Sequence, residues 1–246
     1  MIEERAFPHP PTPDRVDDLQ CRGYKIYQNP DGYCFTSDSI LLANLAKVKR
    51  SDRVVDLCTG SGVIALLIKA KYEPKEVIGV ELQPRLAAMA QRSVELNNAA
   101  DVRIVCARVQ GIYKDIGTGF DVVTVNPPYE PKPDKEEYTE EDVCKTEAEI
   151  TLEEVVEEST KLLRFGGLFY MVNRARRLSE TLFLMTKHGI EPKKLYLIQP
   201  KKDKAVDAFV VEGKRGGKPA LDVPAPIIVY DENGVYTPEV RSLYNQ

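Results

Sequence analysis

The chain has 246 residues, of which 43% are hydrophobic and 29% charged, a composition ordinary for one large globular domain or one domain with additions. Its formal net charge of −4 argues against a generally basic nucleic-acid binder, and its five cysteines and two histidines show no metal-ligand spacing, so we expect no metal site. The scattered cysteines, with no CxxC pair, favour a reducing, cytoplasmic setting. Residues 1–20 have no apolar core, which argues against a signal peptide, and the longest apolar runs are about six residues, which argues against a membrane span.

Charge is unevenly distributed along the chain. Residues 130–158 hold 13 acids and 3 bases, a net of −10, which leaves 31 bases and 25 acids, a net of +6, in the other residues. This asymmetry predicts either a basic face elsewhere on the protein or a solvated acidic helix beside an otherwise neutral surface.

The N-terminal part is expected to be an addition to the main domain. Residues 1–22 are rich in proline and aspartate and predict a flexible extension. Two short alternating runs, split by Asn29-Pro30-Asp31-Gly32, predict a β-hairpin over residues 23–35. Thr36-Ser37-Asp38-Ser39 then supplies N-cap residues for a helix over 40–46, and we expect this hairpin and helix to fold over the ligand edge of the main sheet.

A glycine loop follows the first strand of the expected core. Residues 53–58 predict a strand, Thr59-Gly60-Ser61-Gly62 a loop and residues 63–71 a helix, an arrangement that lets the backbone approach a nucleotide closely. The next strand, 76–81, ends at Glu81, 19 residues after Gly62, where a carboxylate can hold ribose hydroxyls.

Asp56 bears on the choice of cofactor. The spacing Gly60-x-Gly62-x-x-Ala65 also fits the fingerprint of a nicotinamide cofactor. A carboxylate at Asp56, however, would repel a pyrophosphate and attract the ammonium and sulfonium groups of S-adenosylmethionine. The sign of the charge therefore favours S-adenosylmethionine, with a capping role for Asp56 as the alternative.

Residues 120–129 are the stretch around which the rest of the chain is organised. Phe120–Val125 predicts a buried strand, and Asn126-Pro127-Pro128-Tyr129 follows it directly. Successive prolines stiffen the backbone and lack N–H donors, so this elbow would present an amide oxygen, a free carbonyl and an aromatic face at the carboxyl edge of the sheet. Two acceptors could hold both hydrogens of an exocyclic amine on a flat ring, and aromatic stacking on a base contributes roughly 1–3 kcal/mol. The alternative is an ordinary Asn-Pro turn.

The remaining pattern alternates strands with helices, which indicates a parallel, doubly wound sheet. Residues 130–150 predict a long loop, which we take as a lid over the target. The other expected elements are helices over 84–98, 151–163 and 175–188, strands over 102–106, 168–172, 194–199 and 206–212, and a hairpin over 227–236 with an Asn233-Gly234 turn.

The predicted fold class is α/β: a doubly wound, Rossmann-like, seven-stranded sheet, mostly parallel with an antiparallel edge strand. An N-terminal hairpin and helix and a C-terminal β-hairpin are added to it. The expected division is an extension, residues 1–22, and one domain, residues 23–246, made of the hairpin and helix (23–50), the core (51–213) and the C-terminal hairpin extension (214–246).

Three segments resemble motifs of the Class I S-adenosylmethionine-dependent amino-methyltransferases: Asp56-Leu57-Cys58-Thr59-Gly60-Ser61-Gly62, Val80-Glu81 and Asn126-Pro127-Pro128-Tyr129. More narrowly, the chain resembles the bacterial tRNA(Val) adenine-N6 methyltransferase family over about residues 23–244. The segments that carry this resemblance are the Asn126–Tyr129 elbow, the terminal hairpin, Ser37-Asp38-Ser39-Ile40-Leu41-Leu42 and Leu152-Glu153-Glu154-Val155-Val156. The resemblance implies an S-adenosylmethionine cofactor and a tRNA substrate.

The resemblance also implies roles for single residues. Its cofactor ligands would be Asp56, Gly60 and Gly62 at the methionine part, with Thr59 beside them, and Glu81 at the ribose. Asn126, Pro127 and Tyr129 would hold the target. The weaker candidates for substrate contacts are Phe35, Asp38, Lys201, Lys202, Lys204, Arg174, Arg176 and Arg177.

The sequence departs from the family after the third strand. Such enzymes commonly place an Asp there that contacts the cofactor adenine, whereas this chain reads Cys106-Ala107-Arg108. Because a guanidinium cannot accept a hydrogen bond from an amino group, we expect backbone groups to contact the adenine.

The expected reaction is in-line transfer of a methyl group to a planar nitrogen, driven by positioning and electrostatics rather than by a strong base. Adenine N6 of tRNA is the favoured acceptor. The alternatives are protein glutamine N5, adenine N6 of DNA, a non-catalytic RNA-binding module on the same scaffold and a nicotinamide oxidoreductase.

Overall fold

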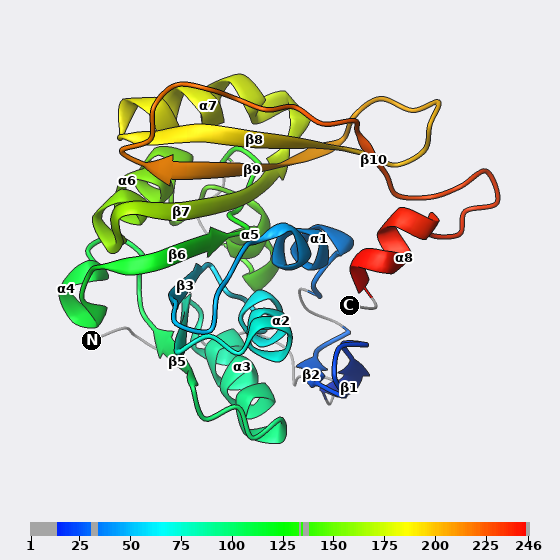
Figure 1. Ribbon diagram of the computed structural model, residues 1–246. Helices are drawn as coiled ribbons and strands as arrows, with labels where there is room; N and C mark the ends of the chain where they lie inside the picture. The colour runs from blue at the N-terminus through cyan, green and yellow to red at the C-terminus, as the bar shows by residue number, and fades with distance from the viewer. Residues whose placement is uncertain (1–13, 31–33, 133, 135–137, 245–246) are drawn as a thin grey trace.

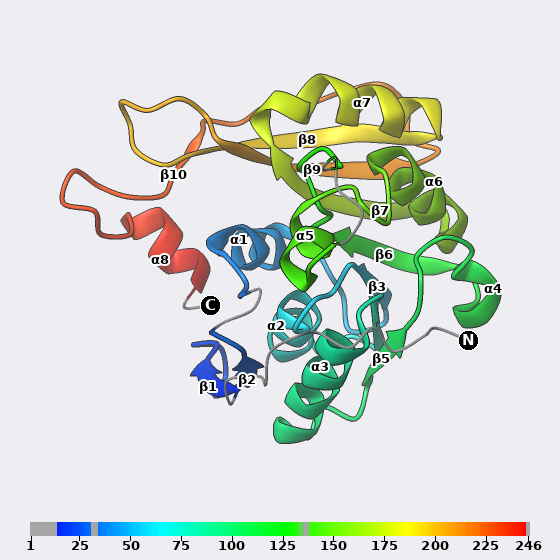
Figure 2. The ribbon, with the colours of Figure 1, turned by 180° about the vertical axis from the view of Figure 1, so that it is seen from behind.

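The computed structural model describes residues 14–30, 34–132, 134 and 138–244. Within them, eight strands form one sheet in the order β10-β8-β9-β7-β6-β3-β4-β5, with helices on both faces (Figures 1 and 2). The strands of this sheet are β3 (Arg53–Leu57), β4 (Glu76–Glu81), β5 (Val102–Cys106), β6 (Phe120–Val125), β7 (Leu163–Arg174), β8 (Ile190–Gln199), β9 (Ala208–Arg215) and β10 (Ile227–Ile228).

Two hydrophobic cores hold the layers together. One core lies on the sheet face that is covered by α1 (Ser37–Leu45) and α2 (Val63–Tyr72), with α3 (Pro84–Leu96) beside them. The other lies under α4 (Tyr113–Ile116), α6 (Leu152–Leu162) and α7 (Leu178–Lys187), which follows the short 3-10 helix Ala175–Arg177. The central strands β3, β4 and β6 are buried on both faces, which is why they read as nearly continuous runs of β-branched residues.

The doubly wound α/β fold is confirmed, with two differences in the sheet. The antiparallel strand is β9, and it lies between β7 and β8 rather than at the edge. The edge is taken by an eighth strand, β10, two residues long and parallel to β8. A two-residue strand carries too little pattern to be predicted, and it is held by its pairing with Ile198 and Gln199.

The N-terminal hairpin lies earlier in the chain than predicted. β1 (Arg15–Asp18) pairs antiparallel with β2 (Lys25–Gln28), so the partner strand comes from the expected extension rather than from residues 33–35. The reason is visible just after β1, where Leu19 and Cys21 are buried and anchor this segment to the core. Residues 1–13 of the expected extension and 31–33 of the expected turn lie outside the described residues.

Two further segments differ from the prediction. Within the expected loop 130–150, α5 (Glu140–Lys145) begins at a capping box in which Thr139 and Asp142 bond to each other's backbone. The expected C-terminal hairpin is reduced to one bridge between Tyr230 and Tyr236, whose rings stack with centroids 5.1 Å apart, and α8 (Pro238–Tyr244) follows it. Among the described residues, no helix has the length and apolar character needed to cross a membrane.

Candidate functional site

A cleft of about 760 Å³ opens where β3, β4 and β6 end. This is the carboxyl edge of the parallel strands, where ligands bind in open α/β sheets. Its walls combine the glycine loop, the end of β4, the elbow after β6 and residues from α1 and the α5 segment. Phe35, a weaker substrate candidate from the sequence, lines the cleft. The other lining residues that the following paragraphs use are Ser39, Thr59, Gly60, Glu81, Gln83, Arg108, Gln110, Asn126, Pro128, Cys144 and Glu149.

The backbone of the glycine loop faces the cleft at Gly60, with no side chain covering it. Gly60 has a φ of +58° and Gly62 a φ of +88°, backbone conformations that residues other than glycine rarely adopt. A Cβ at Gly60 would meet no atom within 4 Å, whereas one at Gly62 would lie 3.2 Å from the Cβ of Ala90 in α3. Gly60 therefore lines the cleft, and Gly62 allows the loop to pack against a helix instead.

Asp56 lies beneath this loop and does not line the cleft. Its carboxylate accepts hydrogen bonds from the hydroxyls of Thr59, at 2.5 Å, and Thr124, at 2.8 Å, and its side chain is fully buried. Burial raises the pKa of Asp56 to about 7, although the two threonine hydroxyls lower it. The structure thus supports the capping role for Asp56, which orders the loop, rather than direct contact with a ligand in the cleft.

Glu81 stands at the cleft wall with its carboxylate fixed by two backbone amides. One carboxylate oxygen accepts from Gly60 N at 2.8 Å and the other from Gln83 N at 2.9 Å. The side chain is 6% exposed, so it is held in one position facing the cleft. A carboxylate at this wall of the cleft can accept hydrogen bonds from ligand hydroxyls.

Asn126 is oriented by α1. Its Nδ2 donates to Ser39 Oγ at 3.0 Å, which places the other end of the amide, Oδ1, as an acceptor at the cleft. No described residue donates to Oδ1. The two prolines after it have no N–H, and the chain resumes backbone bonding at Tyr129, whose N–H donates to Lys145 O at 3.1 Å. Pro128 lines the cleft, whereas Pro127 and Tyr129 lie behind or beside the lining residues.

Tyr129 has one ring face covered by an arginine. The guanidinium of Arg174 lies 4.5 Å from the ring centroid and donates to the phenol oxygen at 3.0 Å. Arg174 also pairs with Asp207 at 2.8 Å and Asp38 at 3.5 Å, and burial raises the pKa of Asp38. A base can therefore stack only on the opposite face of the Tyr129 ring. Asp38 does not line the cleft, and it helps to position Arg174 against Tyr129 instead.

A second polar cluster lies opposite the elbow. Arg108 pairs with Glu149 at 2.9 Å, and Gln110 Nε2 donates to Glu149 O at 3.0 Å and more weakly to Glu154 at 3.4 Å. Since both hydrogens of the Gln110 amide are directed at these oxygens, its Oε1 is left as an acceptor. The Gln110 side chain is thus available to accept a hydrogen bond from the cofactor adenine, in addition to the expected backbone groups.

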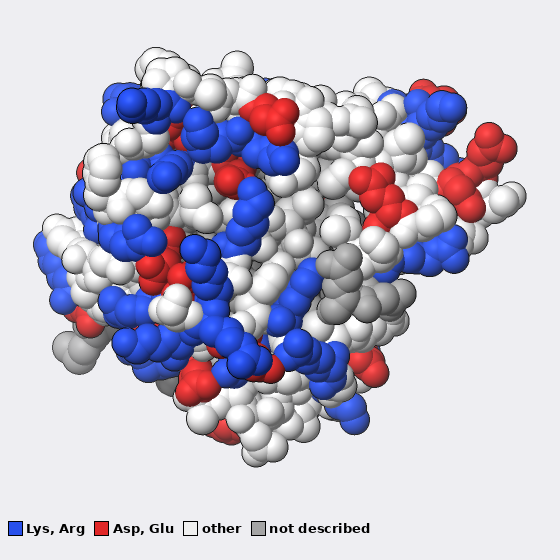
Figure 3. Space-filling model, viewed as in Figure 1, with Lys and Arg blue, Asp and Glu red and all other residues white. Residues whose placement is uncertain are grey.

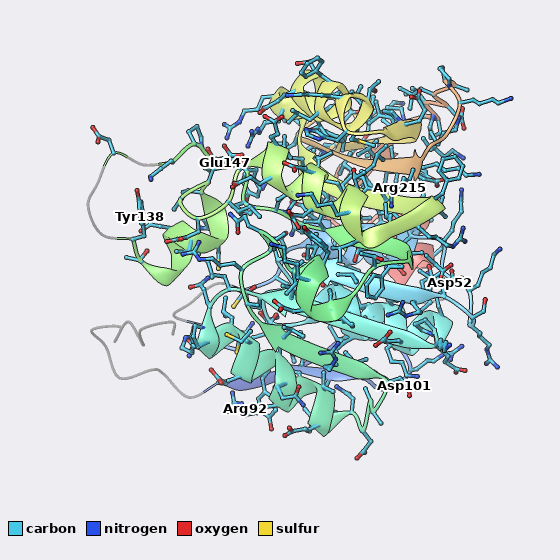
Figure 4. All side chains as sticks on the ribbon, turned by 90° about the vertical axis from the view of Figure 1, so that its left-hand side faces the viewer. Asp52, Arg92, Asp101, Tyr138, Glu147 and Arg215 are labelled. Atoms are coloured by element: carbon cyan, nitrogen blue, oxygen red, sulfur yellow. The ribbon has the colours of Figure 1, made fainter. Side chains whose placement is uncertain are left out.

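The other basic residues that were predicted to contact the substrate lie outside the cleft lining. Arg177 pairs with Glu147 at 2.7 Å and with Glu180, and Arg176 pairs with Glu130 at 2.5 Å, so both hold neighbouring segments together. Figure 4 shows Glu147, the partner of Arg177, at the same side of the view as Tyr138. Lys201, Lys202 and Lys204 lie in the turn after β8, at the carboxyl edge but outside the cleft lining.

Several cleft residues were not predicted as site residues. Ser39 was taken only as a helix-capping residue, although its place in the segment that resembles the methyltransferase family was a usable signal. Gln110, Cys144 and Glu149 lie in segments without a recognisable motif, and they reach the cleft through packing that spans dozens of residues in sequence.

The cleft fits S-adenosylmethionine on the evidence of its own residues. Gly60 exposes backbone to a close ligand, and Glu81 offers a fixed carboxylate for hydroxyl groups. Among the described residues, no cluster of histidine, cysteine, aspartate or glutamate could hold a metal ion.

Comparison with curated proteins gives relatives of two specificities. A tRNA1(Val) (adenine(37)-N6)-methyltransferase of Pasteurella multocida is 27% identical over 214 residues, which cover 84% of this chain and 86% of that protein. A putative protein N5-glutamine methyltransferase of Methanocaldococcus jannaschii is 31% identical over 119 residues, 48% of this chain. The chain spans only 57% of the length of that second relative.

Among solved structures, a predicted O-methyltransferase of Agrobacterium tumefaciens superposes with a TM-score of 0.69 at 24% identity, covering 85% of this chain and 95% of that one. This likeness confirms the fold. The family model of the methyltransferase small domain matches residues 35–189, well over half of the chain. That match confirms the predicted class and its S-adenosylmethionine cofactor. The chain therefore belongs to the methyltransferase small domain family.

Proposed function

We propose that this protein methylates the exocyclic N6 amine of an adenine in tRNA. The observation that carries the proposal is the position of Asn126: its amide lines the same cleft as Gly60 and Glu81, and Ser39 turns its oxygen toward that cleft. The Pasteurella multocida tRNA methyltransferase, which matches most of this chain and most of its own length, supports adenine in tRNA as the acceptor.

The chain's own residues would act by holding the acceptor amine. Asn126 Oδ1 and the carbonyl of Pro127 would each accept one hydrogen of the NH2 group, which fixes the plane of the base and directs the nitrogen lone pair into the cleft. The face of the Tyr129 ring that Arg174 does not cover would stack on the base. S-adenosylmethionine supplies an electrophilic methyl group on a sulfonium. The nitrogen becomes acidic as its new bond forms, so a proton can pass to Asn126, Pro127 or water without a strong base.

Glutamine N5 in a protein is the second candidate acceptor. A primary amide offers the same two hydrogens in a plane, and the Methanocaldococcus jannaschii relative carries that name. Adenine N6 in DNA presents the same group again. The geometry of the elbow accepts all three, so the acceptor has to be identified by its macromolecular context.

A labelling experiment distinguishes these acceptors. The protein is incubated with methyl-labelled S-adenosylmethionine and separate pools of unmodified tRNA, DNA and protein. We expect label in tRNA, recovered as N6-methyladenosine after digestion. Label confined to protein or DNA would replace the tRNA assignment, and an absence of label in every pool would favour the non-catalytic module.

Replacement of Asn126 tests the mechanism. Asn126→Ala removes one acceptor for the amine while leaving the glycine loop and Glu81 unchanged. Turnover should fall by about 100- to 1000-fold, the usual cost of removing one preorganised polar group from an active site. Binding of S-adenosylhomocysteine, measured by calorimetry, should remain within about twofold of the wild type. Turnover near the wild-type rate would exclude Asn126 as the group that holds the amine.

A further inference from the structure

A second depression lies outside the cleft, on the sheet face that α1 covers. It is an open groove of about 1620 Å³. Its walls come from the end of α1 and the loop after it, the end of α2 and the adjoining parts of β6, β7, β8 and β9. The lining residues are Asn44, Leu45, Ala46, Lys47, Val48, Lys49, Asp52, Lys71, Tyr72, Asp121, Val122, Arg164, Gly166, Leu168, Tyr196 and Lys214.

The groove is basic because its acids are already engaged. Five of the lining residues are lysine or arginine and two are aspartate. Asp52 is buried and accepts from the backbone of Lys49, and Asp121 accepts from the backbone of Arg53 and pairs with Arg164 at 2.6 Å. Both carboxylates therefore serve the fold rather than neutralising the open lysines.

Three lysines of the groove have no acidic partner among the described residues. Lys47 pairs with Glu212 at 2.8 Å, whereas Lys49 and Lys214 form no ion pair and are exposed. Lys71 donates only to the neutral Asn44 at 2.7 Å, and burial lowers its pKa. A cation that is partly desolvated without a counter-charge gains from an anionic ligand.

Figure 3 shows where these side chains lie on the surface. Lysine and arginine side chains gather on the left and in the centre of this view, with acidic side chains interspersed among them. Figure 4 shows Asp52, which lines the groove just before β3 begins, and Glu147 of the acidic segment at opposite sides of the view. None of the described residues of the segment 130–158 lines the groove.

The groove and the cleft are joined by α1. Ser39, which binds Asn126, lies near the start of this helix, and Asn44, which binds Lys71, lies near its end. Five residues of α-helix span about 8 Å, so a polymeric ligand can reach both places at once. Tyr72 and Tyr196 add aromatic surface to the groove wall.

We propose that this groove binds the phosphate backbone of the RNA substrate, along the α1 face and away from the acidic segment. The proposal rests on the proposed function, because it takes tRNA as the methyl acceptor. Unpaired lysines beside tyrosines suit a backbone contact that is independent of sequence, and such contacts position the nucleic acid without identifying the target base.

The test compares two double charge reversals in the full-length chain. Lys49→Glu with Lys214→Glu reverses two unpaired groove lysines. Arg103→Glu with Lys114→Glu changes the net charge equally at two exposed bases outside the groove lining. Unmodified total tRNA is the probe, titrated in the presence of S-adenosylhomocysteine, and methylation rates are measured with the same tRNA.

The groove variant should bind tRNA at least about 10-fold more weakly and show a raised KM for tRNA, with kcat and S-adenosylhomocysteine affinity kept. The control variant should lose less than about threefold. Equal losses in both variants, or wild-type affinity in the groove variant, would overturn the proposal. A wild-type protein that fails to methylate tRNA would instead contradict the proposed function, so the two failures are distinguishable.

Discussion

Ser39 determines which end of the Asn126 amide faces the cleft. Its hydroxyl accepts from Asn126 Nδ2, and its side chain is buried at the start of α1. Without that acceptor, the amide can turn its NH2 toward the substrate amine, where it would donate instead of accept. We therefore expect Ser39→Ala to lower kcat about 10-fold while S-adenosylhomocysteine binding is unchanged. Ser37→Ala, two residues earlier on the same helix, should remain within about twofold of the wild type. Equal kcat values for the two variants would show that Ser39 does not orient the Asn126 amide.

The Asp56 carboxyl links the stability of the glycine loop to pH. Burial raises its pKa from 3.8 to about 7 in the folded chain. Because the folded-state pKa lies above the unfolded one, the folded chain binds this proton more tightly. The stabilisation is therefore complete below about pH 4 and is lost as the pH rises through about 7.

Asp56→Asn cannot titrate, so the comparison isolates this group. The free energy of unfolding of Asp56→Asn minus that of the wild type should rise by roughly 4 kcal/mol between pH 4 and pH 7 and then level off. Urea unfolding at five or six pH values in this range measures it. Other titrating groups are common to both proteins and cancel. A difference that stays constant with pH would show that the Asp56 carboxyl is ionised throughout, with an ordinary pKa.

At the scale of elements, the two loop glycines should respond differently to the same substitution. Alanine at Gly62 meets both a positive φ and the Cβ of Ala90 at 3.2 Å, so we expect a loss of about 2–4 kcal/mol in unfolding free energy. Alanine at Gly60 has space, so only about 1–2 kcal/mol of strain is expected, but its methyl group projects from a residue that lines the cleft. S-adenosylhomocysteine affinity should therefore fall about 10-fold for Gly60→Ala. The opposite ranking in either urea unfolding or calorimetry would contradict this division.

The elements that could be predicted are those whose sequence pattern matches their burial. β4 and β5 have the predicted bounds, and β3 ends one residue earlier than expected. The runs of β3 and β4 are β-branched because these strands are buried on both faces, whereas β5, at the edge of the sheet, is only partly buried. β1 could not be predicted, since Arg15–Asp18 is held by backbone pairing and shows no apolar alternation. β7 begins before Gly166-Gly167, because these glycines form an irregularity inside the strand instead of ending the helix before it.

Site residues, like secondary-structure elements, could be predicted only where a local sequence pattern marks them. Gly60, Glu81 and Asn126 could be placed together from the sequence, because each directly follows a parallel strand and such ends meet at one edge of the sheet. Ser39 and Glu149 reach the cleft by packing, and their hydrogen bonds to Asn126 and Arg108 join residues 87 and 41 positions apart. No local pattern encodes those separations.

At the scale of the whole molecule, the protein separates its charges. The acids of residues 130–158 pair largely with basic residues next to them in space, as Glu149 does with Arg108 and Glu147 with Arg177. Three of the groove lysines, Lys49, Lys71 and Lys214, have no acidic partner among the described residues. Lysine and arginine side chains gather on part of the face that Figure 3 shows, which favours a basic face over an otherwise neutral surface as the meaning of the sequence asymmetry.

This separation predicts that salt affects the two ligands of the protein unequally. Each phosphate contact releases about one counterion, so three groove lysines should give log Kd for tRNA a slope of roughly 2 or more against log salt concentration. S-adenosylhomocysteine binds in a cleft whose charged groups are fixed by neighbours, and its slope should be close to zero. Titrations between 50 and 300 mM NaCl measure both, and the Lys49→Glu with Lys214→Glu variant should lose about two units of the tRNA slope. A tRNA slope as shallow as that of the cofactor analogue would mean that the basic face takes no part in RNA binding, whatever the methylation assay shows.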